Sequence, residues 1–504
     1  MTTSMGVTSR TDIAVIGAGF GGIGMGHYLR EAGIRSFAIF EKRGEVGGVW
    51  RENTYPGAGC DVPSHFYSFS FARRHPWTYR YARQPEILDY LKGCARADDL
   101  YEHIRFHHEV IGADFDEARG IWVLRFANGR RHEARFLVSA VGQLHRPSIP
   151  AIPGRERFRG HAFHSAEWDH DVDLTGKRIA VIGTGASAVQ FVPRIADAAE
   201  RVHVFQRSPG WVAPKFEKPF TRLEHKLMNR FGLLKDLDRL RIFLLTEALG
   251  FCYRGHKWAE RLVTWMSRAQ IRIQVRDPAL RAKLTPDFPI GCKRILLTTE
   301  WLPALTRPDV DLVTDGVREI TPEGIVTADG REWPVDAIIY GTGFAATEFL
   351  APMTIRGRGG RLLHEAWRDG AQAYRGVAVS GFPNLFTLYG PNTNLGSGSI
   401  VYMLERQQRY IVRMWRLLER RGLSHVEVRE SAERAYNDWL GERSRRSTFE
   451  ADCQSWYKNA AGMNINNWVG SQLEYARLMR TPEPAHYRLV APGEAGEDAG
   501  RRAA

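Results

Sequence analysis

The stretch IAVIGAGFGGIGMGHYLREAG, residues 13–33, decides the fold of this chain. An apolar run is followed by a glycine-rich turn and then by a helical pattern. Gly17 allows a tight turn, Gly19 lets the backbone approach a pyrophosphate, and Gly22 permits close packing of a helix on a strand. Glu41 closes the next strand, FAIFE, where its carboxylate can accept hydrogen bonds from a ribose. These residues predict the first βαβ unit of a dinucleotide-binding domain.

The same pattern returns in RIAVIGTGASAVQ, residues 178–190, where Gly183, Gly185 and Ala188 take the three positions of the turn. The strand that follows has no acid at the ribose position and ends instead in Arg207. A guanidinium can bind a 2′-phosphate through two hydrogen bonds, so the second nucleotide is expected to be NADP. The alternative is a solvated arginine at the end of a strand. A first site with a ribose acid and a second with an arginine together indicate FAD that receives electrons from NADPH.

Composition excludes several classes of protein. With 43% hydrophobic and 25% charged residues among 504, the chain can bury several cores and is expected to form two or three domains. No apolar run approaches the roughly 18 residues of a membrane span, and no signal peptide is visible. The five cysteines are odd in number and lack CxxC spacing, which argues against a disulfide framework and a structural zinc site and favours a reducing cytoplasm. A metal site at His103, His107 and His108 is disfavoured because this segment alternates like a strand.

The positive charge is concentrated in one segment. The chain has a net charge of +13, but residues 211–284 hold 16 basic and 7 acidic residues, which argues against a nucleic-acid partner. Apolar residues recur there at three- and four-residue spacing, at Leu223, Leu227, Phe231, Leu234 and Leu237, followed by Tyr253, Trp258 and Trp265. Peripheral contact with an anionic membrane is one interpretation. The alternative is that the stripe packs against the NADP domain while the arginines stay solvated.

Two further motifs carry a resemblance to a known family. GGVWRENTYPGAGCD, residues 47–61, and FRGHAFHSAEWD, residues 158–169, contain GxWxxxxYPGxxxD and FxGxxxHxxxW followed by Asp, with complete spacing. At these residues the chain resembles the type I Baeyer–Villiger monooxygenases, from about Asp12 to Arg480. The related flavin-containing N- and S-oxygenases share the FxGxxxHxxxW pattern only loosely.

The resemblance implies an enzyme that uses NADPH and O2 to insert an oxygen atom next to a ketone carbonyl, through a C4a-peroxyflavin, to give an ester or a lactone. It implies that Arg294 lies beside the flavin and stabilises the negative charge of the reaction, with Asp61 positioning it. Lys293 would help to hold the 2′-phosphate, whereas the alternative for Lys293 and Arg294 is a solvated pair. Trp456 is similar to the family's mobile-loop tryptophan that contacts NADP, and His164 is expected to be a structural residue of a linker.

The expected cofactor-binding residues are Gly17, Gly19, Gly22, Glu41, Gly48, Val49, Trp50, Asp61, Tyr67, Val110, Gly183, Gly185, Ser187, Ala188, Gln190, Arg207, Ser208, Lys293 and Trp456. After Trp456 the chain lacks the Asn-Ile-Pro-Gly-Lys run of the best-known branch of the family. It resembles the branch that acts on aryl and lipophilic ketones.

The predicted fold class is α/β, with two dinucleotide-binding (Rossmann-like) domains, the NADP domain inserted in the FAD domain, and a helical insertion. The expected boundaries are 11–145 for the first part of the FAD domain, 146–176 for a linker, 177–210 and 285–370 for the NADP domain, 211–284 for the basic helical insertion, 371–485 for the second part of the FAD domain, and 486–504 for a disordered tail.

Two other functions stay open at this point. A sulfide or amine oxygenase would use the same flavin intermediate. A flavoprotein with degraded catalysis could serve as an NADPH-dependent redox partner or a membrane-bound binding protein, although Asp61 and Arg294 argue against it.

Overall fold

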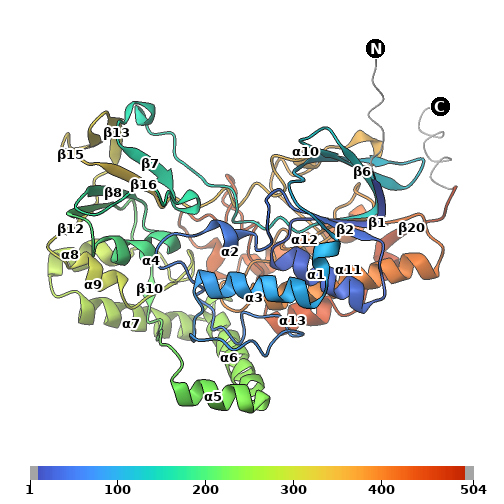
Figure 1. Ribbon diagram of the computed structural model, residues 1–504, viewed down its shortest axis with the longest axis horizontal. Coiled ribbons are helices and arrows are strands. Elements are labelled where there is room, and N and C mark those ends of the chain that lie inside the picture. The colour runs from blue at the N-terminus through green and yellow to red at the C-terminus, as the bar shows by residue number, and fades with distance from the viewer. Residues whose placement is uncertain (1–8, 494–504) are drawn as a thin grey trace.

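The computed structural model describes residues 9–493 and is organised around two sheets that begin at the two glycine-rich turns (Figure 1). The larger sheet has the strand order β17-β4-β5-β6-β1-β2-β3, with β18 paired to β6. Its strands are β1 Ser9–Ile16, β2 Phe37–Phe40, β3 Ile104–Arg105, β4 Val110–Asp116, β5 Ile121–Phe126, β6 Arg131–Ser139, β17 Thr354–Arg356 and β18 Leu385–Thr387. Strand β1 pairs in parallel with β2 and β6 and is buried at its carboxyl end, which explains why residues 13–16 are continuously apolar.

The smaller sheet is wholly parallel and has the order β12-β9-β8-β16-β7. Its strands are β7 His161–His164, β8 Arg178–Ile182, β9 Arg201–Phe205, β12 Val310–Val313 and β16 Ala337–Tyr340. The remaining strands are the antiparallel β13 Val317–Thr321, β14 Gly324–Thr327 and β15 Glu332–Pro334, and the pairs β10 Val212–Ala213 with β11 Leu296–Leu297 and β19 His425–Val428 with β20 Tyr487–Val490. The α/β class that the sequence predicts is confirmed.

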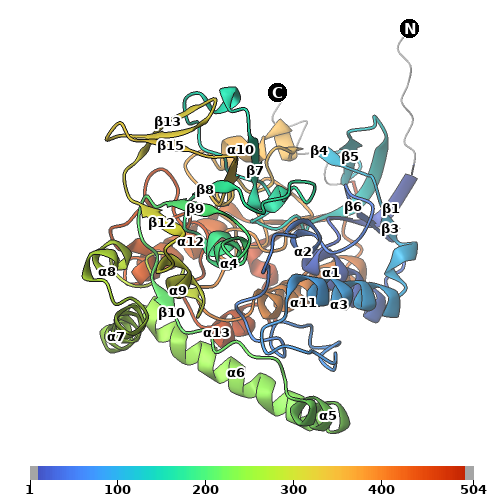
Figure 2. The same ribbon diagram turned by 60° about the vertical axis from the view of Figure 1, so that its left-hand side comes forward.

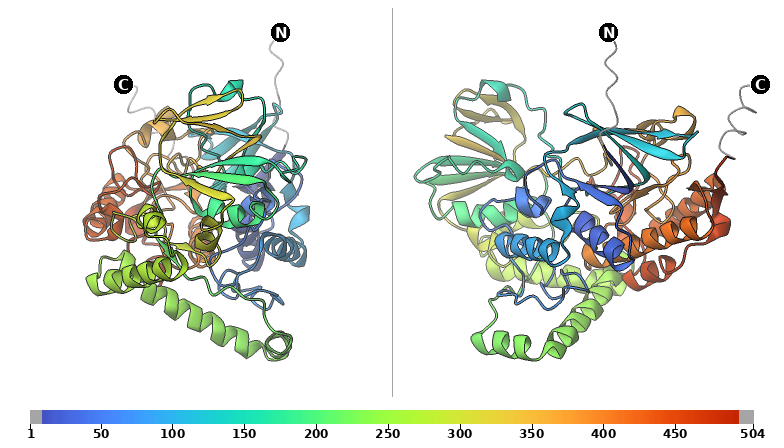
Figure 3. Two further views of the ribbon diagram at one scale, coloured as in Figure 1. Left: turned by 90° about the vertical axis from the view of Figure 1, so that its left-hand side faces the viewer. Right: turned by 45° about the vertical axis from the view of Figure 1, so that its right-hand side comes forward.

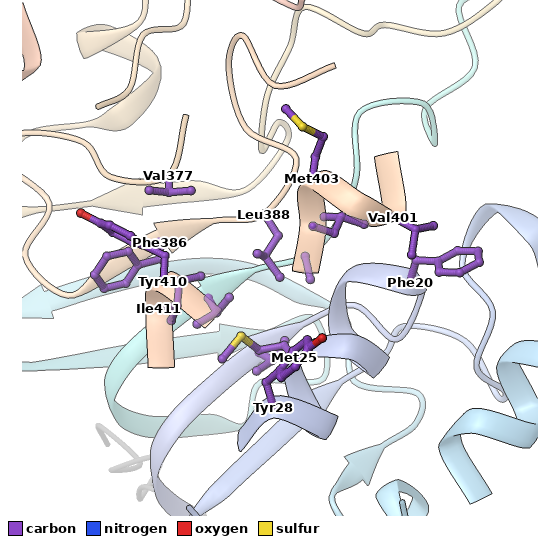
Figure 4. Close-up of a cluster of buried hydrophobic side chains, with 14 of the residues drawn as sticks. Phe20, Met25, Tyr28, Val377, Phe386, Leu388, Val401, Met403, Tyr410 and Ile411 are labelled. Carbon is purple, nitrogen blue, oxygen red and sulfur yellow. The ribbon is translucent and has the colours of Figure 1, made fainter. Parts of the chain in front are cut away.

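Two helices that are distant in sequence pack together beneath the larger sheet. They are α1 Phe20–Glu31 and α11 Ile400–Arg420. The hydroxyl of Tyr28 on α1 donates a hydrogen bond of 2.8 Å to Glu405 on α11. Figure 4 shows the buried side chains between them and the neighbouring strands, among them Phe20, Met25, Tyr28, Val377, Phe386, Leu388, Val401, Met403, Tyr410 and Ile411. The C-terminal part of the chain therefore completes the core that the first glycine-rich turn begins.

The segment predicted as a helical insertion forms four helices. They are α5 Arg222–Arg230, α6 Gly232–Tyr253, α7 Lys257–Gln274 and α8 Pro278–Leu284. Helix α5 begins with a capping box between Thr221 and Glu224. Figures 2 and 3 show α5 and α6 along the lower edge of the molecule, away from both sheets. Within residues 9–493, no helix combines the length and the apolar character that crossing a membrane requires.

The other helices are short or cover the sheets. They are α2 Val49–Glu52, α3 Gln84–Ala97, α4 Ala186–Ile195, α9 Trp301–Leu305, α10 Leu363–Ala366, α12 Glu430–Ser444 and α13 Gln472–Leu478. The 3₁₀ turns are η1 Leu100–Glu102, η2 Arg155–Arg157, η3 Ser165–Glu167, η4 Arg358–Gly360, η5 Thr448–Glu450 and η6 Pro484–His486.

Three predicted boundaries are wrong where short strands join a sheet. Strand β17 pairs with β4, so part of the segment 285–370 belongs to the larger sheet. Strand β7, in the predicted linker 146–176, is the edge strand of the smaller sheet. Strand β20 lies in the predicted tail 486–504 and pairs with β19, while residues 494–504 are outside the described residues. Strands of three or four residues gain their stability from tertiary pairing, and their own sequences are too short to predict them.

Candidate functional site

A cavity of about 2050 Å³ lies between the two sheets and is lined by both glycine-rich turns. Gly17 and Gly183 each follow the carboxyl end of a central parallel strand, β1 and β8. In open α/β sheets this edge is where ligands bind. The cavity is therefore bordered by the carboxyl edges of both sheets, at β1 and at β8.

The first turn has a backbone shape that only glycine can supply. Gly17 has φ of +98°, and a Cβ there would lie 2.9 Å from the carbonyl oxygen of Ala140. A Cβ at Gly22 would overlap the carbonyl oxygen of Gly17. Gly19 precedes α1, and its Cβ position is 3.5 Å from the Cα of Gly48. The helix N-terminus therefore faces an open backbone cradle that fits a pyrophosphate.

Polar groups around this cradle fit the remainder of a dinucleotide. Glu41 is buried and accepts hydrogen bonds from the backbone N–H of Ala18 at 2.9 Å and of Arg43 at 3.0 Å, which holds its carboxylate beside the turn. Among the described residues, the Oε1 of Gln143 and the Nδ1 of His145 are buried in the cavity lining without a hydrogen-bond partner. Buried polar atoms are almost always satisfied, so these two fit the polar edge of a bound ring system. Neither residue could be predicted from the sequence.

The other residues predicted for the first nucleotide also line this part of the cavity. Gly48, Val49 and Trp50 surround the start of α2, and the indole of Trp50 donates to the hydroxyl of Tyr67 at 3.0 Å. Val110 opens β4 and completes the lining.

The second turn repeats the first at the smaller sheet. Gly183 has φ of +104°, and a Cβ there would lie 2.6 Å from the carbonyl oxygen of Gly341. Gly185 caps α4, whose first turn carries Ser187 and the fully buried Ala188. This turn therefore also presents a helix N-terminus to the cavity.

A cluster of cations lies beyond the second turn. Arg207 and Ser208 follow β9, and the Nζ of Lys293 donates to the hydroxyl of Ser208 at 2.8 Å. Burial lowers the pKa of Lys293, and the nearby charge of Arg207 lowers it further. Two neighbouring cations form a site for a dianionic group such as a phosphate.

Arg294 and Asp61 form an ion pair where the two halves of the cavity meet. The Nε and Nη2 of Arg294 donate to Oδ2 of Asp61 at 3.1 and 2.6 Å. The two side chains keep 27% and 24% of their surface exposed, and both line the cavity. Burial alone would raise the pKa of Asp61, but Arg294 and then Lys215 hold it below its usual value. Asp61 raises the pKa of Arg294, so the guanidinium is permanently charged.

Three tyrosines that the sequence did not indicate surround Arg294. They are Tyr253, Tyr389 and Tyr457, which come from α6, from the loop after β18, and from the segment after Trp456. Burial raises the pKa of each phenol, to about 12 for Tyr457, so all three are neutral near pH 7. Tyr389 donates to Asn394 at 2.6 Å, whereas the hydroxyl of Tyr457 is buried without a partner in the described chain. Neutral phenols leave the positive charge of Arg294 available to a ligand.

Gln190 links the two halves of the cavity. From α4 its Oε1 accepts a hydrogen bond from the hydroxyl of Tyr55 at 2.9 Å, and its Nε2 donates to the carbonyl of Gly59 at 2.9 Å. Tyr55 and Gly59 lie in the same motif as Asp61. The helix of the second turn is thereby fixed relative to the Asp61–Arg294 pair.

The comparisons with known proteins agree with this geometry. Residues 10–353 match the family model described as "Flavin-binding monooxygenase-like". A Baeyer–Villiger monooxygenase of Pseudomonas aeruginosa is 42% identical over 95% of this chain and 91% of its own length, and one of Streptomyces coelicolor is 41% identical over 96% and 93%. The structure of an oxidised steroid monooxygenase bound to NADP matches with a TM-score of 0.85 and 32% identity, over 95% of this chain and 99% of the other. A closed structure of cyclohexanone monooxygenase matches with a TM-score of 0.86 and 27% identity, over 96% and 100%.

The chain belongs to the type I Baeyer–Villiger monooxygenases of the flavin-binding monooxygenase-like family. It is an FAD- and NADPH-dependent enzyme that oxidises ketones to esters or lactones. The predicted family, activity and cofactors are confirmed, and the sulfide or amine oxygenase and the redox partner are not favoured.

Two residues to which the resemblance to Baeyer–Villiger monooxygenases assigns a role, Trp456 and His164, lie in different surroundings. Trp456 lines the cavity and packs against Tyr457 with ring centroids 4.4 Å apart. His164 lies at the end of β7, where its Nδ1 accepts a hydrogen bond of 3.1 Å from the backbone N–H of Ala166. Burial lowers the pKa of His164, which favours a neutral ring with a structural role.

One expectation about the cysteines is wrong. Cys292 and Cys453 form a disulfide, whereas Cys60, Cys94 and Cys252 are free and buried. Cys292 directly precedes Lys293, and Cys453 lies three residues before Trp456, so the bond ties the tryptophan loop to the segment of Arg294. A separation of 161 residues gives no spacing signal, which is why the pair could not be predicted. In residues 9–493, no group of three or more His, Cys, Asp or Glu side chains is arranged to hold a metal ion.

Proposed function

We propose that Arg294 and Asp61 carry the oxygen-transfer step of this ketone oxidation. Bound FAD, reduced by NADPH, supplies the redox chemistry. Asp61 holds Nε and Nη2 of Arg294, and no hydrogen bond to Nη1 occurs among the described residues. Nη1 is therefore the donor that can meet the carbonyl oxygen of the ketone. A fixed guanidinium stabilises the negative charge that develops on this oxygen, and a preorganised donor of this kind typically contributes a large part of catalysis.

The proposed cofactor contacts follow the two turns. FAD would bind Gly17, Gly19, Gly22, Glu41, Gly48, Val49, Trp50, Asp61, Tyr67 and Val110, and NADPH would bind Gly183, Gly185, Ser187, Ala188, Gln190, Arg207, Ser208, Lys293 and Trp456. The fit of the glycine cradles and of the unpartnered cavity atoms supports the first set. The second set is supported by the cation cluster of Arg207 and Lys293.

The substrate that we propose is a lipophilic ketone. The cavity wall on the side of the helical insertion is rich in apolar side chains, including those of Ile242, Leu245, Leu249, Val263 and Met266. Apolar walls with few polar groups favour ligands of low polarity. Together with the free Nη1 of Arg294, this lining would orient a ketone by its carbonyl while accepting a large hydrocarbon body.

We further propose that the enzyme works in the cytoplasm, in peripheral contact with a membrane through residues 211–284. The net positive charge of this segment supports attraction to an anionic surface. With β7, β17 and β20 reassigned to their sheets, the proposed domain division is otherwise that of the sequence, with an NADP domain inserted between two parts of an FAD domain.

The first prediction concerns the choice of cofactor. Arg207→Ala should lower the preference for NADPH over NADH by about thirtyfold, because a charged contact to the 2′-phosphate is worth on the order of 2 kcal/mol. The measurement is kcat/KM for both cofactors. Arg201→Ala, at the opposite end of β9 and paired with Asp311 on the surface, is the matched control. Equal use of both cofactors by the unmodified enzyme would refute the assignment.

The second prediction concerns pH. Lys293 is charged below its pKa, and this pKa is lowered, so its charge is lost on raising the pH earlier than that of an ordinary lysine with a pKa near 10.4. The NADPH preference, measured as a ratio of kcat/KM values, should therefore decline as the pH is raised through that lowered pKa. Lys293→Arg should abolish the decline because a guanidinium stays charged. A flat profile for the parent enzyme, or the same decline in Lys293→Arg, contradicts the proposed contact.

The third prediction separates oxygen transfer from flavin reduction. Arg294→Ala should still bind FAD and be reduced by NADPH, but ketone turnover should fall by a factor on the order of 10² to 10³. The measurements are the anaerobic bleaching of the flavin and the yield of ester per NADPH consumed. Arg178→Ala removes another arginine that pairs with an aspartate, Asp336, outside the cavity, and serves as the control for general destabilisation. Ketone turnover within about tenfold of the parent would exclude Arg294 from the mechanism.

A further inference from the structure

Three charged residues of helix α6 hold it to the body of the protein. Lys235 is buried, and its Nζ donates to the backbone carbonyls of Arg74 and His75, each at 3.0 Å. Asp238 pairs with His65 at 2.7 Å, and Arg239 donates to the carbonyl of His65 at 2.8 Å. These contacts attach the helix to the body of the protein through charged groups.

The outer side of α6 is a row of leucines at three- and four-residue spacing. Their exposed fractions range from 38% to 68%, and they are Leu233, Leu234, Leu237, Leu240, Leu244, Leu245 and Leu249. Leu223, Leu227 and Phe231 at α5 and Trp258, Leu262 and Trp265 on α7 are exposed as well. We call these residues the outward apolar face. The prediction that the stripe packs against the NADP domain is therefore wrong.

This concentration of apolar surface is confined to the insertion. Apart from Ile111, Ile149, Met463 and Leu473, every large hydrophobic residue that is exposed in the described chain lies between Phe216 and Ile273. A helix at a water-exposed surface normally turns most of its apolar residues inward, so the exposed row of leucines on α6 indicates that something covers them. Figures 2 and 3 show that α5 and α6 form an edge of the molecule that is free to meet a flat surface.

The charges around the outward apolar face identify the kind of surface. Six exposed basic residues of α5 and α7 have no ion-pair partner within residues 9–493, namely Arg222, Lys226, Arg230, Arg261, Arg268 and Arg272. Six of the seven acids of residues 211–284 are engaged, as Glu217 with Lys215, Glu224 with Lys218, Asp236 with Arg73, Asp238 with His65, Glu247 with Gln472 and Glu260 with Lys257. The seventh, Asp277, caps the start of α8. The unneutralised charge is thus positive and complements anionic lipid head groups. A second copy of this chain would bring the same positive charges together, which disfavours a dimer through this face.

The outward apolar face is continuous with the catalytic cavity. Leu245 and Leu249 are exposed on the outer side of α6 and also line the cavity. Ile242, Val263 and Met266 continue the apolar lining inward, in the same cavity that Arg294 lines. An apolar molecule could therefore move from the surface toward the guanidinium along these apolar side chains.

We propose that the outward apolar face docks on the surface of an anionic phospholipid bilayer, and that ketones dissolved in the bilayer enter the cavity past Leu245 and Leu249. The evidence for docking comes only from the contacts and exposed residues of α5, α6 and α7. Entry of the substrate from the bilayer rests on the proposed function, because it requires a lipophilic ketone at Arg294.

Docking is tested by co-sedimentation of the FAD-loaded enzyme with phosphatidylcholine vesicles that contain or lack phosphatidylglycerol. We expect binding to the anionic vesicles at low salt and its loss at high salt. Leu237→Gln with Leu244→Gln should weaken binding at least tenfold, whereas Ile111→Gln with Leu473→Gln, which removes as many exposed apolar residues elsewhere, should not. Arg222→Gln with Lys226→Gln and Arg230→Gln should weaken it on the order of a hundredfold, since each base near an anionic surface contributes about a factor of five to ten.

The charge control is Arg35→Gln with Arg420→Gln and Arg421→Gln, three exposed bases outside the insertion. The proposal is overturned if the parent stays in the supernatant at low salt, if it binds neutral vesicles equally, or if the control sets weaken binding as much as the test sets. It is also overturned if the parent forms a dimer in solution that Leu237→Gln with Leu244→Gln dissociates, because the face would then belong to a second copy.

Entry from the bilayer is tested by turnover of two ketones. A small water-soluble ketone should be oxidised equally by the parent and by Leu237→Gln with Leu244→Gln, whose positions do not line the cavity. A long-chain ketone held in anionic vesicles should be oxidised at least tenfold more slowly by the double variant. Equal rates on the vesicle-bound ketone would overturn entry from the bilayer. Failure of the parent on both ketones would instead refute the proposed substrate class, while the sedimentation result would still decide docking.

Discussion

The ion pair between Arg294 and Asp61 is the interaction on which the architecture depends. Its two residues are 233 positions apart, and each lies at the border of one nucleotide site. Asp61 belongs to the motif that Gln190 fixes to the second turn, whereas Arg294 directly follows the lysine of the cation cluster. The pair can form only when both glycine-rich turns face the same cavity. The positions of the two cofactor sites and of the reactive guanidinium are therefore set together.

Two cations of the cavity, Arg294 and Lys293, have different electrostatic surroundings, and the difference matches the role that we propose for each. Arg294 has a carboxylate partner that raises its pKa, so its charge is present whether or not a ligand is bound. Lys293 donates to a hydroxyl and lies near both Arg207 and Asp287, and burial followed by the charge of Arg207 lowers its pKa. Burial and a neighbouring cation make the charged form of Lys293 unfavourable, and the binding of an anion relieves this cost. The charge of Arg294 is thus balanced by Asp61 before any ligand binds. The charge of Lys293 is stabilised by the 2′-phosphate that we propose binds there.

Much of the site could be predicted because its signals are local. The tight turns need glycine at Gly17, Gly22 and Gly183, and such requirements are visible in a few adjacent residues. Tyr253 and Tyr457 could not be predicted, because they reach Arg294 only through the packing of distant segments, as does the Cys292–Cys453 disulfide. The orientation of α6 could not be predicted from the sequence either. Periodicity shows that a helix has an apolar side, but only the contacts of Lys235, Asp238 and Arg239 show that this side faces outward.

The claim that Asp61 acts by positioning Arg294 is tested most directly by a double-mutant cycle. The variants are Asp61→Asn, Arg294→Lys and the two combined, and the quantity compared is the turnover of a saturating ketone under conditions where flavin reduction is complete. If Asp61 acts through Arg294, the combined variant should be little slower than Arg294→Lys alone, with a coupling energy of about 1 to 3 kcal/mol. Losses that add to within about 0.5 kcal/mol would show that the two residues act independently and would contradict the account.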